Sequence, residues 1–245
     1  KPYNPGNVTN VFYVADGATM IVTSKLKPSG SDAYAGSCGV RKTGKGTWRQ
    51  AGMIGDTNGN WHPGLFEIVE GTMQMTYSGA PIVDYIYVHS GAMYDASSQN
   101  ARTVAWGDKT KFRVDKGGTI KLCVYNGFND VAPRGIEGEG DVIVAGGYDE
   151  NILMMTLTGG PYRFDGKIYS TYSKPAEFYV GTKGTGQFII GAADTLAGTN
   201  GTGKLFYYPL VSPGWGRGVG DRRKGGCTDP HGGRGRRADH AARGI

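Results

Sequence analysis

Leucine is scarce in this chain, at only 8 of 245 residues. Because long helices are built from strong helix formers such as leucine, the shortage argues against a helical bundle. No apolar run approaches the roughly 18–20 residues that a membrane helix needs, so we expect no membrane partner. Charged residues make up 20% and apolar residues 38% of the chain. Residues 1–210 are therefore predicted to be neither disordered nor membrane-spanning.

Cysteine and histidine are also scarce. The three cysteines, Cys38, Cys123 and Cys227, are too few for a disulfide framework. Whether Cys38 pairs with Cys123 depends on a distance that the sequence does not supply. Only two of the four histidines, His62 and His89, precede residue 211. A metal site built from three histidines is thereby excluded from residues 1–210.

Glycine and tyrosine are abundant, at 43 and 15 residues. Short β-branched and aromatic segments alternate with turns rich in Gly, Asn, Asp and Pro. Residues 10–14 and 19–24 flank an Asp-Gly turn, residues 65–69 and 72–77 flank Glu70-Gly71, and residues 111–114 and 119–125 flank a turn at 115–118. Such turns are typical of hairpins. About a dozen short strands at this spacing predict an all-β sandwich or barrel.

The net charge of +6 is concentrated at one end. Residues 211–245 contain eight basic and three acidic residues, which leaves residues 1–210 with a charge of only +1. This Gly/Arg-rich tail has no hydrophobic period, and we expect it to be disordered, or not native to the protein. Nucleic acid is expected as a partner only through the tail, since the remainder has no basic excess.

Two weak internal repeats occur in the same order. Residues 75–79 (MTYSG) resemble residues 155–159 (MTLTG), and residues 112–119 (FRVDKGGT) resemble residues 178–185 (FYVGTKGT). In the second pair, Phe112 corresponds to Phe178. The repeats predict two tandem β modules, at residues 1–130 and 131–210, followed by the tail at 211–245.

Residues 48–125 resemble the small cupins. The segment 65–71 (LFEIVEG) looks like the cupin strand pair that ends in a Glu-Gly turn. Gly107-Asp108, followed by Phe112, Val114 and Gly117, looks like the second cupin motif. The resemblance implies a jelly-roll barrel, the double-stranded β-helix of cupins.

The cupin metal ligands are missing from the corresponding positions. The resemblance puts Asn58, Asn60, Gly64 and Ile120 where cupins carry histidines and a glutamate. None of these side chains is a good ligand for a transition metal. We therefore expect no metal, no cofactor and no catalytic residues.

A cluster of aromatic and histidine residues is the candidate binding site. Trp61 and His62 lie in a polar loop between strands, and Tyr85, Tyr87 and His89 alternate along one segment. Because side chains in a strand alternate between faces, these last three share one face. Aromatic faces beside polar groups suit a sugar. A buried aromatic layer and, for Trp61, a surface turn are the alternatives.

The composition favours a structural or interaction protein, such as a virion, capsid, filament or cell-surface component, that associates with itself into an oligomer. A metal-free cupin-like module that binds a small polar ligand such as a sugar, or a degenerate cupin enzyme, is the alternative. An extracellular or virion location fits the first hypothesis.

Overall fold

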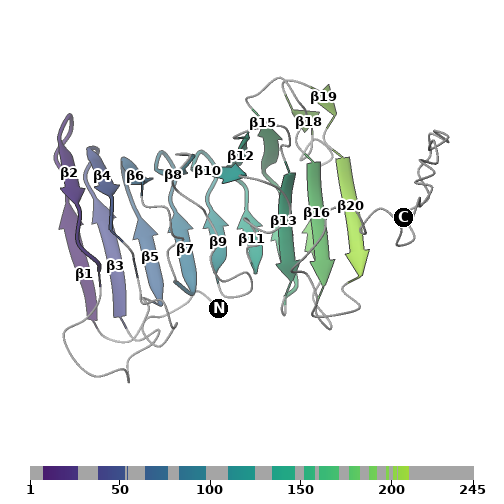
Figure 1. Cartoon of the computed structure of the whole chain (residues 1–245), viewed down its shortest axis with the longest axis horizontal. Coiled ribbons are helices and arrows are strands. Elements are labelled where there is room, and N and C mark those ends of the chain that lie inside the picture. The colour runs from purple at the N-terminus through teal and green to yellow at the C-terminus, as the bar shows by residue number, and fades with distance from the viewer. Residues whose placement is uncertain are drawn as a thin grey trace, which may run out of the picture. The chain divides into compact units, whose positions relative to one another are not determined.

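The computed structural model (Figure 1) describes the segments that form the strands and their corners. These are residues 8–26, 38–52, 54, 64–76, 83–97, 110–124, 134–146, 152–157, 160–170, 177–182, 188–191, 197–198, 201–202 and 204–209.

Two parallel sheets make up most of the described fold. The eight-stranded sheet, called sheet A here, is ordered β1-β3-β5-β7-β9-β11-β14-β17, and the seven-stranded sheet B is ordered β15-β12-β10-β8-β6-β4-β2. The strands of sheet A are β1 (Val8–Tyr13), β3 (Cys38–Thr43), β5 (Leu65–Ile68), β7 (Tyr85–Val88), β9 (Lys111–Val114), β11 (Gly135–Gly138), β14 (Tyr162–Phe164) and β17 (Phe188–Ile190). The strands of sheet B are β2 (Thr19–Val22), β4 (Thr47–Gln50), β6 (Thr72–Met75), β8 (Met93–Ala96), β10 (Thr119–Val124), β12 (Asp141–Gly146) and β15 (Lys167–Ser170).

The chain winds as a parallel β-solenoid. Each coil contributes one strand to sheet A, turns a short corner, contributes one strand to sheet B, and returns to sheet A (Figure 1). Corresponding residues of successive coils pair in register: Ile86 pairs with Phe112, and Phe112 with Ile136. Each strand therefore obtains its backbone hydrogen bonds from strands of the adjacent coils.

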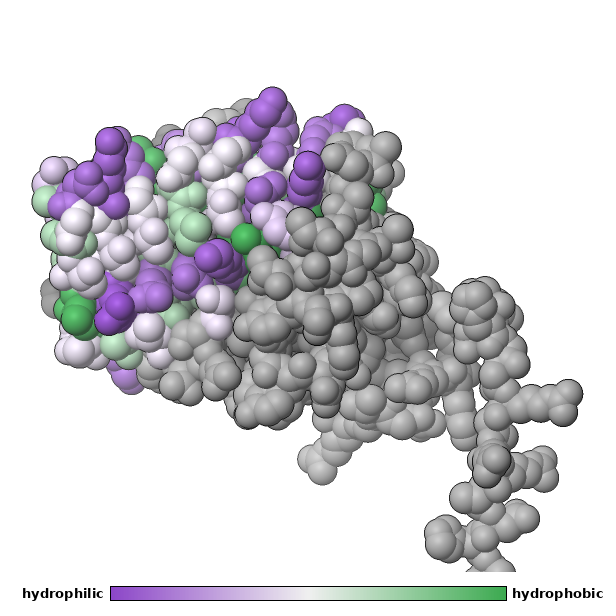
Figure 2. Space-filling model, turned by 90° about the horizontal axis from the view of Figure 1, so that it is seen from above, coloured by the Kyte–Doolittle hydropathy of each residue, from purple (hydrophilic) through white to green (hydrophobic). Residues whose placement is uncertain are grey.

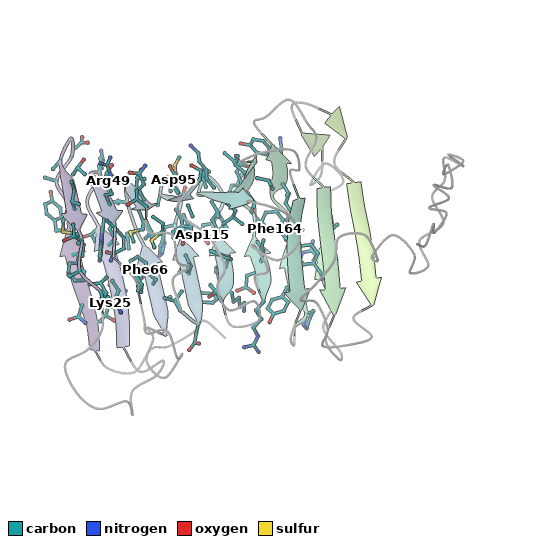
Figure 3. The ribbon with its side chains drawn as sticks, viewed as in Figure 1. Lys25, Arg49, Phe66, Asp95, Asp115 and Phe164 are labelled. Carbon is teal, nitrogen blue, oxygen red and sulfur yellow. The ribbon has the colours of Figure 1, made fainter. Side chains whose placement is uncertain are left out.

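The core lies between the two sheets. Alternate residues of each strand point inward, so that Phe66 and Ile68 of β5 meet Met73 and Met75 of β6 in one continuous apolar cluster. The Trp48 ring bridges the sheets, with its centroid 4.6 Å from that of Phe12. Figure 3 labels Phe66 and Phe164 within this row of core side chains, several strands apart.

A column of small residues lets the corners stack. One glycine or alanine per coil immediately precedes the sheet B strand, and its carbonyl accepts a hydrogen bond from the first strand residue of the next coil, as in Thr72 N–H to Gly46 O at 3.2 Å. A Cβ at Gly46 would lie 2.1 Å from the carbonyl oxygen of Ala15, and one at Gly166 would lie 1.9 Å from that of Gly140. The small-residue column consists of Ala18, Gly46, Gly71, Ala92, Gly118, Gly140 and Gly166.

A third parallel sheet forms where the returning segments themselves become strands. It is ordered β13-β16-β20 and consists of β13 (Ile152–Leu157), β16 (Glu177–Thr182) and β20 (Lys204–Pro209). A small antiparallel pair, β18 (Ala197–Gly198) and β19 (Gly201–Thr202), completes the described strands. The chain divides into two units, Lys1–Pro213 and Gly214–Ile245.

The predicted jelly-roll, cupin-like or sandwich architecture is wrong, although the all-β class is right. Cupin barrels and β-sandwiches are built from antiparallel strands, whereas the sheets A and B found here are parallel throughout. The predicted equivalence of Phe112 and Phe178 in two barrel repeats is wrong as well. Phe112 lies in β9 of sheet A, whereas Phe178 lies in β16 of the third sheet, so the two residues are not equivalent.

The turns predicted to close hairpins are instead corners between sheet A and sheet B. Gly17 and Gly117 have φ of 71° and 83°, the positive φ that tight turns often require of glycine. However, the two flanking strands enter different sheets instead of pairing with each other. Within the described residues, no helix is long and apolar enough to cross a membrane.

Candidate functional site

The outer face of sheet A carries a connected set of polar and aromatic side chains. Ile86 and Val88 of β7 point into the core, so Tyr85 and Tyr87 point outward, and His89 continues their row. Ring centroids are 6.4 Å apart for Tyr85 and Tyr87, and 4.0 Å apart for Tyr87 and His89. The outer ladder, as we call this set, consists of Arg41, Glu67, Tyr85, Tyr87, His89, Lys111, Arg113, Asp115 and Glu137.

Glu67 connects three coils. Its Oε2 lies 2.6 Å from Arg41 Nε in the preceding coil, and its Oε1 lies 2.7 Å from His89 Nε2 in the following coil. Glu67 is only 8% exposed, although it lies on the outer face. A buried carboxylate requires partners of this kind, because burying an unpaired charge costs several kcal/mol.

Asp115 gathers the next group of contacts. Its Oδ2 accepts a hydrogen bond of 2.7 Å from the Tyr87 hydroxyl and lies 3.7 Å from His89 Nδ1. Arg113 Nε lies 3.5 Å from Asp115 Oδ1, and the guanidinium lies 5.0 Å from the centroid of the Tyr87 ring. Burial, and then the hydrogen bond to Asp115, raise the pKa of Tyr87 to about 12. Figure 3 labels Asp115 near the middle of the stack.

Glu137 extends the outer ladder to β11. The Tyr85 hydroxyl donates a 2.6 Å hydrogen bond to Glu137 Oε1 across two coils, and Lys111 Nζ lies 3.1 Å from Glu137 Oε2. Lys111 Nζ also lies 5.2 Å from the Tyr85 and Tyr162 ring centroids. Burial and the Glu137 hydrogen bond raise the pKa of Tyr85 well above its usual range.

The outer ladder is electrically balanced, and in the part of the chain that the structure describes its histidine lies against carboxylates. Three cationic side chains face three carboxylates, and each carboxylate contacts at least one of the cations. A hydrolytic site needs a hydroxyl or thiol within hydrogen-bond reach of a base. Among the described residues, the His89 imidazole instead lies within ion-pair distance of the Glu67 and Asp115 carboxylates, and its ring packs against that of Tyr87. These carboxylate contacts join successive coils of the solenoid.

Lys42 forms a second polar cluster, inside the corner. Its side chain points inward from β3 and is fully buried. The ammonium donates hydrogen bonds to the carbonyl oxygens of Gly44, Gly46 and Glu70, the last two at 2.6 and 2.7 Å. Lys42 thus ties two successive corners together. Burial lowers its pKa, against the raising effect of the Glu70 charge.

The predicted site residues fall into two groups. Tyr85, Tyr87 and His89 lie together in the outer ladder, whereas Trp61 and His62 lie outside the described residues. That these residues bind a ligand stays a prediction.

The four residues at the positions of the cupin metal ligands are not gathered into one site by the described structure. Ile120 is buried in the core and Gly64 is buried before β5, while Asn58 and Asn60 lie outside the described residues. Among the residues that the structure describes, no group of three or more His, Cys, Asp or Glu side chains could hold a metal ion.

Sequence reasoning missed the charged members of the outer ladder. These side chains come from other coils than the tyrosines: Arg41, Glu67, Lys111, Arg113, Asp115 and Glu137. Arg41, for example, is 26 residues from the Glu67 that it contacts. The signal that could have found them is the small-residue column, which repeats at similar intervals and fixes the register. No protein-family model, curated protein or solved structure matches the chain.

Proposed function

We propose that the chain is a structural and interaction protein, a solenoid that holds its surface at a fixed geometry and assembles with further copies in a filament, virion or cell surface. The observation that carries the proposal is the outer ladder. Its bonds run from coil to coil, from Arg41 on β3 to Glu137 on β11. Side chains arranged in this way reinforce the stack.

The physics of stacking supports the same function. Each coil contacts mainly its neighbours, so stability accumulates along the stack as it does in repeat proteins. Every coil adds about 4.8 Å, the distance between hydrogen-bonded strands. Successive coils are joined at three levels. In the core, Phe66 packs against Trp48; at the corner, Lys42 donates hydrogen bonds; and on the outer face, the outer ladder links the strands. A solenoid of this kind is suited to holding other molecules at fixed intervals along its surface.

Binding of a sugar on the aromatic row has weaker support. A sugar site needs polar groups that converge on the ligand and aromatic faces that are open to it. The Tyr85 and Tyr87 hydroxyls instead donate to Glu137 and Asp115, and His89 Nε2 lies against Glu67. The Tyr87 ring already contacts His89 and Arg113. A ligand would have to displace these bonds.

Light scattering over a hundredfold range of protein concentration tests the proposal. We expect a mass that rises with concentration beyond that of one chain. A chain that stays monomeric throughout, and whose tyrosine fluorescence is altered by an oligosaccharide in the wild type but not in Tyr87→Phe, would overturn the structural assignment in favour of ligand binding.

A further inference from the structure

The first coil differs from all other described coils in its surface. The large apolar side chains that are exposed among the described residues are Val11, Tyr13 and Ile21, with exposed fractions of 58%, 72% and 57%. All three lie in β1 or β2. Figure 2 shows green apolar residues at the left end of the stack, which is the end that these strands form in Figure 1.

Both strands of this coil are edge strands. In the described part of the chain, β1 pairs only with β3, and β2 pairs only with β4. On the other side of each strand, the backbone N–H and C=O groups pair with no other strand among the described residues. An edge of this kind is a template on which another strand can pair.

The edge lacks the features that prevent such pairing. Proteins protect exposed edges with charged side chains, proline or bulges. β1 (VTNVFY) and β2 (TMIV) contain no charged residue and no proline. The inward residues Phe12, Met20 and Val22 are only partly buried against the core. One more layer of strands would complete their burial.

We propose that the first coil is the interface for a second copy of this chain, joined edge to edge about a two-fold axis. The inference rests on the proposed function and names its partner. A two-fold axis perpendicular to the sheets brings β1 against β1 and β2 against β2 of the second copy, antiparallel in both cases. Strands without charge can meet their own copies at no electrostatic cost, whereas a charged partner would find no counter-charge on them.

The register of the β1–β1 pairing is restricted by which side chains of β1 point inward and which point outward. Directly opposed residues of an antiparallel pair point to the same face, and a shift of one residue would place apolar side chains on the wrong side. The outward residues of β1 are Thr9, Val11 and Tyr13, with Val11 in the middle. Pairing Thr9–Tyr13 of the two copies keeps the faces matched. It sets Val11 opposite its own counterpart and Thr9 opposite Tyr13, and it leaves Val8 opposite Val14.

The interface is small, with strands of six and four residues from each copy. Stable interfaces bury about 800 Å² on each partner. We therefore expect a weak association that depends on concentration, and that a single charge can abolish.

Charge-swap mixing of the full-length chain tests the two-fold arrangement. Val11→Lys and Val11→Glu each set like charges opposite each other, and we expect each to weaken dimerisation by at least about tenfold in Kd in sedimentation velocity. An equimolar mixture of the two variants should restore association, because the charges then attract. Thr47→Lys, on the outer face of the interior strand β4, is the matched control and should associate as the wild type does.

Each outcome decides between the proposals. Single variants that weaken association without rescue in the mixture would overturn the two-fold arrangement in favour of head-to-tail stacking. Association unaffected by either variant would overturn the first-coil interface and leave the proposed function standing. A wild type that never associates would overturn both. Val11 is more than half exposed, so both variants should fold, and circular dichroism of each verifies this.

Discussion

The stacked corners make a quantitative prediction about two glycines of similar backbone conformation. Gly71 and Gly91 have φ of 65° and 75°, so alanine at either position adopts a left-handed conformation, which costs roughly 1–2 kcal/mol. A Cβ at Gly91 would have nothing within 4 Å. A Cβ at Gly71 would lie 2.5 Å from both Gly46 O and Lys42 Nζ.

The two substitutions should therefore differ in cost. Forcing an extra methyl group into a packed site costs about 1–3 kcal/mol. We expect Gly91→Ala to lower the free energy of unfolding by about 1–2 kcal/mol, the conformational cost alone. Gly71→Ala should lower it by about 2–5 kcal/mol, because the conformational and steric costs add. The Gly46 oxygen belongs to the backbone and cannot move aside without disturbing the adjacent corner.

Urea unfolding, followed by circular dichroism and tryptophan fluorescence, measures both values. The matched backbone conformation makes Gly91→Ala the control for Gly71→Ala, and equal m-values would show that both variants unfold the same structure. Equal losses of stability in the two variants would refute the reasoning. The corner of β5 and β6 would then not lie against the corner of β3 and β4.

Three further predictions concern buried polar groups. Because burial lowers the pKa of Lys42 below 10.5, the unfolded chain holds more protons between the lowered value and 10.5. The stability of the wild type relative to Lys42→Met should therefore rise with pH across that window in urea titrations, and a constant difference would contradict this. The Tyr87 pKa is raised from 10.0 to about 12, so the folded state holds the extra proton in that range and stability falls as pH rises. Tyr87→Phe should lose less stability over the same range, whereas an identical decline in both proteins would count against the Asp115 hydrogen bond. The Tyr94 hydroxyl is buried with no hydrogen-bond partner among the described residues. Tyr94→Phe should thus leave stability unchanged or raise it by about 1 kcal/mol, and a loss of more than about 1 kcal/mol in thermal or urea unfolding would reveal a partner.

The strands could be predicted from the sequence, but their pairing could not. The predicted strand at 111–114 is β9, and the predicted strands at 65–69 and 72–77 contain β5 and β6. Alternation and turn residues act locally, and they are the same whether the chain folds back as a hairpin or turns a corner into a second sheet. Gly71 has a positive φ, as the glycine of a tight hairpin turn would, but it lies in a corner. The small-residue column carries the missing information, since hairpins do not require a small residue once per coil.

The candidate site was predictable to the same extent. Period-two geometry placed Tyr85, Tyr87 and His89 on one face from a single segment. Their partners Asp115 and Glu137 come from later coils. Glu137, which accepts the hydrogen bond from the Tyr85 hydroxyl, is 52 residues from Tyr85. Only the register between coils brings these groups together, and register is a property of the stack.

The unequal length of the coils has a practical consequence for engineering. Lys42 pairs with Ile68, 26 residues on, whereas Ile68 pairs with Val88, only 20 residues on. Lys42 is five residues before the paired Thr47, and Ile68 is four before Thr72, so the corner accounts for one residue of the difference. The segments that return from sheet B to sheet A account for the rest. Those return segments are the places where a foreign peptide could be grafted. Grafts in successive coils would be displayed at a pitch of about 4.8 Å, set by the backbone and independent of the grafted sequence.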